Sequence, residues 1–80
     1  MSDARNDLNA AVSWHIKAVC VKPSDEELWY NLGNVLGKAG KKAERLFCFM
    51  KAEECGFLEL KGFIRDLVAQ GIKPVDPRPS

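Results

Sequence analysis

The chain has 80 residues, which is enough for one small domain. Its composition, 46% hydrophobic and 29% charged, is typical of a globular protein and excludes the disordered class. Twelve basic and eleven acidic side chains give a net charge of +1, which excludes a strong overall attraction to nucleic acid or to an anionic membrane. No apolar run approaches the roughly 20 residues that span a bilayer, and the polar start of the chain predicts a cytoplasmic protein without a secretion signal.

Four helices are predicted. In the first, about residues 3–21, apolar residues recur at steps of three and four, and Pro23 ends the helix. The second begins at Ser24, which is predicted to form a capping box with Glu27, and it runs to about Lys38. Its residues predicted to face inward are Leu28, Trp29, Leu32, Val35 and Leu36.

A turn follows in which Gly40 is predicted to take the left-handed conformation, and the third helix then covers about residues 41–55. The fourth is predicted over about residues 58–70. The inward residues of these two helices are expected to include Leu46, Phe47, Phe49, Met50, Ala52, Leu60, Phe63, Ile64, Leu67 and Val68. Residues 1–74 are therefore predicted to be a single helical domain, and residues 75–80 a flexible, proline-rich tail.

Residues 29–34, Trp-Tyr-Asn-Leu-Gly-Asn, carry most of a Trp-x-x-Leu-Gly-x-x-Tyr signature, with Leu36 in the tyrosine position. Later positions of the same pattern hold a turn glycine, an aromatic residue and a small residue, which are Gly40, Phe49 and Ala52. Over about residues 11–57 the chain resembles a tetratricopeptide-repeat protein, with one full motif and a preceding half motif.

This resemblance implies an all-α fold: a short, right-handed α-α superhelix of antiparallel helical hairpins, with about four helices and the last one as a cap. Two residues depart from the pattern. Phe57 occupies a proline position, and Arg45 occupies a position that is normally small. We expect the Arg45 guanidinium to extend to solvent, to meet a carboxylate, or to wedge the two helices apart.

In the family, peptides lie in a groove along the first helix of each pair. The corresponding positions here are Glu27, Tyr30, Asn31, Asn34 and Lys38, which are the predicted partner-binding residues. Tyr30 offers apolar area and a hydroxyl group, while the asparagine amides can bond an extended backbone. The alternative is that these are ordinary surface residues. A family subset that clamps terminal carboxylates has a lysine where this chain has Tyr30, so that clamp is not expected.

Trp14 lies at a position that is often exposed, so it is also a predicted partner-binding residue. An exposed tryptophan can anchor a partner, or it can mark the place of a missing neighbouring helix. Both readings predict an apolar patch near the N-terminus and association there, with a partner or as a homo-oligomer through exposed repeat ends.

No residue set predicts catalysis, a metal or a cofactor. His15 is the only histidine and is expected to pack in the interior, and phosphate-binding loops and nucleophile motifs are lacking. The odd number of cysteines, Cys20, Cys48 and Cys55, predicts buried thiols in a reducing cytosol rather than disulfides.

We therefore expect a non-enzymatic interaction module that binds a partner peptide or helix. One alternative is a small chaperone or assembly subunit that self-associates or folds with its partner. The other is a helix–turn–helix nucleic-acid binder, since a glycine-containing turn joins two helices. The basic cluster Lys38, Lys41, Lys42 and Arg45 around this turn could contact phosphate or an acidic partner. The balanced net charge makes nucleic acid an unlikely partner, and solvated lysines near a helix end explain the cluster as well.

Overall fold

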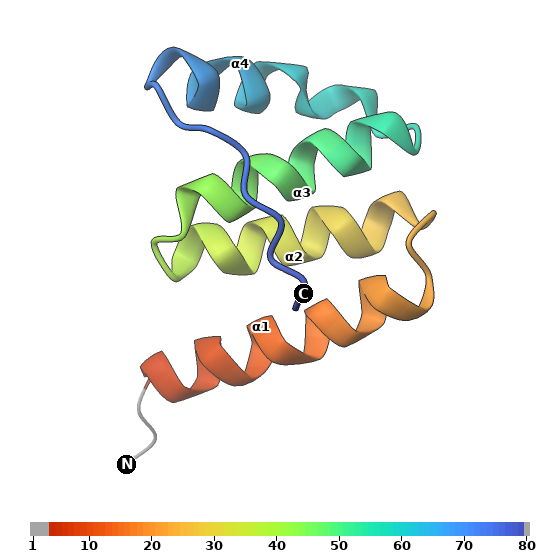
Figure 1. Ribbon diagram of the computed structural model, residues 1–80, viewed down its shortest axis with the longest axis vertical. Helices are drawn as coiled ribbons and strands as arrows, with labels where there is room; N and C mark the ends of the chain where they lie inside the picture. Colours follow the sequence, from red (N-terminus) through yellow and green to blue (C-terminus); the bar gives the residue numbers. More distant parts are fainter. Residues whose placement is uncertain (1–3, 80) are drawn as a thin grey trace.

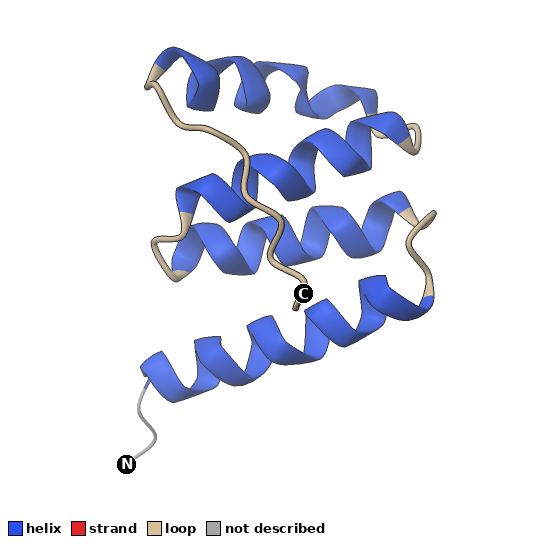
Figure 2. Cartoon of the chain, viewed as in Figure 1, coloured by secondary structure: helices blue, strands red, loops and turns tan. Residues whose placement is uncertain are grey.

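The computed structural model describes residues 4–79. Within this range the chain forms four α-helices and one short 3-10 helix, which confirms the all-α class (Figure 2). These are α1 (Ala4–Val21), α2 (Glu26–Lys38), α3 (Lys42–Glu54), η1 (Leu58–Leu60) and α4 (Lys61–Ala69). The α-helices stack in chain order, each antiparallel to the one before (Figure 1). Within the described range, no helix has both the length and the hydrophobicity needed to cross a bilayer.

The hairpin of α2 and α3 is the centre of the fold. Gly33 allows the two helices to approach closely, because a Cβ atom built on it would lie 2.5 Å from Cε1 of Phe49. Ala52, one turn further along α3, is fully buried as predicted. The core of the described chain also contains Val12, Val19, Trp29, Leu32, Leu36, Leu46, Cys48, Leu60 and Leu67. Small residues at the contact thus let large apolar side chains fill the space around it.

The two ends of α2 are determined by residues at the ends themselves. Gly40 has φ of +79°, as predicted for the residue that ends α2. The predicted Ser24 cap is wrong: Asp25 is the N-cap, and its carboxylate accepts hydrogen bonds from the amides of Glu27 and Leu28. Aspartate is as good a cap as serine, and starting one residue later still places the apolar stripe inward. The indole of Trp29 donates a hydrogen bond of 2.7 Å to the Pro23 carbonyl oxygen.

The helix predicted over residues 58–70 is divided into two elements, the 3-10 helix η1 followed directly by α4. Phe57 lies in the turn just before η1. Three residues predicted to face inward are largely exposed: Met50 (40%), Phe63 (50%) and Val68 (56%). Helix α4 ends the described stack, so a stripe of apolar residues on it exceeds the area that α3 can cover (Figure 1).

The C-terminal segment, residues 72–79, runs from the end of α4 back across α3 and α2 toward α1 (Figure 1). The amide of Val75 donates a hydrogen bond of 3.1 Å to the carbonyl oxygen of Ala43. Near its end, the Arg78 guanidinium lies over the rings of Trp29 and Phe47, at 5.3 Å and 5.9 Å from the ring centroids. The segment is therefore in contact with the helices, and its predicted flexibility stays a prediction.

Candidate binding groove along α2

One side of α2 borders the turn after α3. Glu26, Tyr30, Asn34 and Gly37 recur at steps of three and four, so they share this side of the helix. Two hollows open here. The first, of about 330 Å³, is lined by Glu26, Gly56, Phe57, Leu58 and Glu59. The second, of about 410 Å³, is lined by Asn34, Gly37, Lys38 and Arg45.

A row of aromatic rings joins the two hollows. Tyr30 stacks on Phe57 with 4.6 Å between ring centroids, and it stacks on Phe49 at 6.0 Å. Phe49 in turn lies 5.9 Å from Phe63 of α4, and Arg45 covers both of these rings. We call the two hollows and this row the α2 groove.

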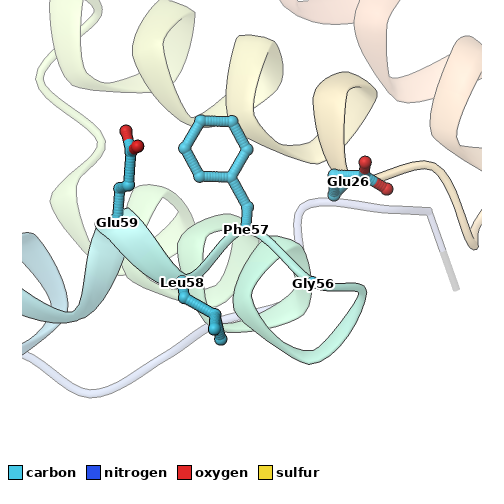
Figure 3. Close-up of a pocket in the computed structure, with 5 residues that line it drawn as sticks. All are labelled: Glu26, Gly56, Phe57, Leu58 and Glu59. Atoms are coloured by element: carbon cyan, nitrogen blue, oxygen red, sulfur yellow. The ribbon is translucent and has the colours of Figure 1, made fainter.

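In the first hollow, the Phe57 ring points from the turn after α3 toward α2, and the carboxylates of Glu26 and Glu59 lie on either side of it (Figure 3). Phe57 occupies the position where the repeat pattern has proline, so the departure supplies a stacking partner for Tyr30. Both glutamates are exposed, and this end of the groove is therefore acidic.

In the second hollow, the Arg45 side chain lies against two aromatic rings. Its guanidinium carbon lies 5.0 Å from the Phe49 centroid and 5.9 Å from that of Phe63. Gly37 makes the space, because a Cβ atom built there would lie 2.9 Å from Cδ and Nη1 of Arg45. The guanidinium thus takes the place of a side chain at position 37 and rests on two rings.

The charge of Arg45 is not neutralised by a neighbouring carboxylate. In residues 7–79 the ion pairs are Lys51–Glu54 and Asp76–Arg78, and Arg45 takes part in neither. Its Nε atom is buried and has no hydrogen-bond partner in that part of the chain. The Lys38 ammonium lines the same hollow, which makes this end of the groove basic.

The predicted partner-binding residues separate into two groups. Tyr30, Asn34 and Lys38 belong to the α2 groove. Glu27 and Asn31 line neither hollow of the groove, and Glu27 instead lines an open hollow at the α1–α2 loop.

Trp14 lies on α1, away from the α2 groove. It is 71% exposed, in agreement with its prediction, and it lines a shallow apolar hollow of about 180 Å³ with Lys17, Ala18 and Val21. Together with Val21, which is 77% exposed, it forms an apolar patch on the outer side of α1.

Comparison of the chain with protein-family models, with curated proteins and with solved structures found no match. The side chains of the groove themselves indicate what it can bind. The groove offers the faces of aromatic rings, an amide group at Asn34, and opposite charges at its two ends. Groups of these kinds can bind the apolar side chains, the backbone and the charged side chains of an extended or helical segment.

The three cysteines are unpaired, but their surroundings differ. Cys48 is buried as predicted, and burial raises the pKa of its thiol far above the ordinary value. The pKa of the half-buried Cys55 is also raised, again chiefly by burial. The prediction was wrong for Cys20, which is exposed because it lies on the outer side of α1. Within the described residues, no three acidic, histidine or cysteine side chains are grouped as metal ligands.

Sequence reasoning missed the contributions of Gly37, Phe57, Glu59 and Phe63 to the groove. One signal was available, since Gly37 follows Gly33 by one turn and lies on the same side of α2. The others depend on how η1 and α4 return over α3, which the repeat pattern does not describe.

Proposed function

We propose that the chain is a non-enzymatic protein-interaction module of the tetratricopeptide-repeat type, and that it binds a partner peptide or helix along α2. The observation that supports it most is the contact of Gly33 with Phe49. Trp29, Leu32 and Ala52, which are further positions of the repeat pattern, are buried in the same hairpin. Such a hairpin leaves part of the surface of its first helix open to a partner.

The α2 groove suits this role physically. Its floor is a row of aromatic rings in which Phe49 is buried, while Tyr30, Phe57 and Phe63 are partly exposed and supply contact area at a small cost in side-chain entropy. Polar groups at its ends fix the orientation of what lies between them. We place the protein in the cytoplasm, where a reducing environment keeps three unpaired thiols stable.

The test is affinity capture from the native cell extract with the full chain as bait, using two matched double variants. The groove variant carries Asn34→Ala and Lys38→Ala, and the control carries Gln70→Ala and Lys73→Ala, at two exposed positions that line neither hollow of the groove. A partner protein should be retained by the wild type and by the control, and lost with the groove variant. Equal retention by all three proteins would contradict the proposal. Retention of nucleic acid that falls steeply with salt would favour the nucleic-acid alternative instead.

A second candidate function, self-association, is favoured by the patch of Trp14 and Val21 on α1. In the described stack α1 packs on α2, and its other side forms an end of the stack (Figure 1). A second copy of the chain could cover this end and bury both side chains. Sedimentation velocity at increasing concentration should then show a dimer for the wild type and a monomer for Trp14→Lys. An identical profile for the two proteins would exclude this interface.

A further inference from the structure

The two ends of the α2 groove carry opposite charges, and this polarity restricts what can lie in it. Glu26 and Glu59 line the first hollow, and Lys38 and Arg45 line the second. The 11 helical steps from Glu26 to Gly37 span about 17 Å, which equals the length of about five residues of extended chain. The inference drawn from this rests on the groove binding proposed above, and it specifies the chemistry of the partner.

The Arg45 hollow has the features of a carboxylate site. The rings of Phe49 and Phe63 hold the guanidinium plane, so little side-chain freedom is lost when it binds. An arginine donor fork pairs well with the two oxygens of a carboxylate, and Asn34 and Lys38 line the same hollow. Within the described chain, Arg45 takes part in no ion pair.

The ends of the helices do not decide the charge preference of this hollow. It lies beside the last turn of α2, which carries partial negative charge, and the first turns of α3, which carry partial positive charge. These contributions oppose each other, so the formal charges of Lys38 and Arg45 determine the sign of the potential. An anionic group is therefore favoured there.

We propose that the α2 groove binds an extended partner segment of about six residues that carries an acidic side chain at one end and a basic side chain at the other. The acidic side chain occupies the Arg45 hollow. The basic side chain lies between Glu26 and Glu59, and the apolar residues between them cover Tyr30 and Phe63. Because Phe63 is 50% exposed, it gives such apolar residues a surface to bury.

The acid in this proposal is a glutamate or aspartate side chain of a protein segment rather than a phosphate of a nucleic acid. Two cationic groups line the hollow, whereas nucleic-acid binding sites commonly contact about 6–10 phosphates. The acidic first hollow, about 17 Å away, would repel a polyanion that followed the groove.

The test is an NMR titration of the ¹⁵N-labelled full chain with the peptide acetyl-Glu-Leu-Ala-Leu-Ala-Lys-amide, which is blocked at both ends and so has no terminal carboxylate. The Arg45 Nε–H resonance, the Gly37 amide and the Asn34 side-chain amide should shift together. A peptide with glutamine in place of glutamate should bind about tenfold more weakly, because it loses the charge-assisted bonds to Arg45. A peptide with glutamine in place of lysine should be weakened less, since both glutamates are exposed.

The variants Arg45→Lys and Arg65→Lys form a matched pair. Arg65 is exposed and lies two positions from Phe63, so it belongs to a different side of α4. Arg45→Lys should reduce binding of the glutamate peptide about tenfold, and Arg65→Lys should leave it unchanged. The comparison of peptides uses the unaltered chain, so it decides the matter even if an Arg45 variant fails to fold.

Three results would overturn the inference. The first is the absence of any shift at millimolar peptide. The second is equal binding of the glutamate and glutamine peptides. The third is a stronger response to inorganic phosphate or to an oligonucleotide than to the glutamate peptide. If the partner captured from extract is lost with the Asn34/Lys38 variant but retained by Arg45→Lys, the groove function holds and the carboxylate site alone is wrong.

Discussion

Two arginines lie over aromatic rings on the same helical hairpin, and their surroundings differ. Arg78 covers Trp29 and Phe47, and its guanidinium makes two short bonds to the Asp76 carboxylate, of 2.8 Å and 3.0 Å. Arg45 covers Phe49 and Phe63 without a carboxylate partner in the described chain. The ring contact is common to both sites, whereas the charge is neutralised at only one of them.

The Arg78 guanidinium is already paired within the chain, whereas the Arg45 guanidinium is available to bind a carboxylate of a partner. At Arg78, the Asp76 carboxylate accepts the hydrogen bonds of the guanidinium. The C-terminal segment thus supplies both the cation that covers the hairpin and the anion that pairs with it. At Arg45 the fork has no such acceptor, and the surrounding groove is open. Experiments that disturb one site and leave the other unchanged can therefore test the distinction.

The largest effect is expected from Gly33→Ala. The new methyl group would lie 2.5 Å from Phe49, the ring beneath Arg45, so the hairpin must shift. Overpacking of this kind costs about 1–3 kcal/mol of unfolding free energy, and we expect the upper part of that range. Chemical denaturation should measure it, and the Arg45 Nε–H resonance should move more than that of Arg78.

Gly62→Ala is the matched control for this change, because a Cβ built on Gly62 meets nothing within 4 Å beyond its chain neighbours and the backbone of its own helix. It should leave stability unchanged or raise it by up to about 1 kcal/mol, as alanine favours a helix. An equal loss of stability in the two variants would show that the close approach at Gly33 is not what sets the hairpin.

Arg78→Ala comes next in size. It removes the cation from the faces of Trp29 and Phe47 and also the bonds to Asp76, so we expect a loss of about 1 kcal/mol. Trp29 should become more accessible to water, and its fluorescence should shift to longer wavelength. Lys73→Ala, at an exposed position of the same segment, is the control and should change neither quantity. Unchanged fluorescence in Arg78→Ala would contradict the closed arrangement of the segment.

A smaller effect is expected for Arg45→Ala. It gives up two ring contacts but also removes a buried Nε atom without a partner, so the net loss should be about 0.5 kcal/mol. Thermal unfolding, with Lys42→Ala as the control, measures this. A rise in melting temperature would instead indicate that Arg45 strains the hairpin.

The smallest expected effect is the loss of stability when the Asp76 carboxylate is protonated at low pH. The hydrogen bonds from Arg78 lower the pKa of the Asp76 carboxyl group below its ordinary value of 3.8. Its contribution to stability is therefore complete above that value and is lost as the pH falls through the lower pKa of the folded state. Since the pair is largely exposed, we expect less than about 0.5 kcal/mol. The stability difference between wild type and Asp76→Asn should shrink on acidification, and a difference independent of pH would contradict the pairing.

The sequence was sufficient for the hairpin because its determinants are local. Gly33, Phe49 and Ala52 stand at fixed spacings, and each spacing translates directly into a side of a helix. The exposure of Trp14 was predictable for the same reason, since the residue falls outside the apolar stripe of its helix.

The position of Arg45 was not predictable, because it depends on Phe63, 18 residues further along the chain. The exposure of Phe63 and Val68 depends on what covers α4, and the apolar pattern of one helix does not contain that information. The shift of the α2 cap from Ser24 to Asp25 reflects two adjacent residues of nearly equal capping strength.

The bond between Val75 and Ala43 has a mechanical consequence. A force pulling on the C-terminus meets the segment that lies across the hairpin before it reaches α4, so Arg78 should detach first and Val75 second. The two contacts then break one after the other, each at a low force. Helix α4 therefore bears no tension until the whole C-terminal segment has detached from the hairpin.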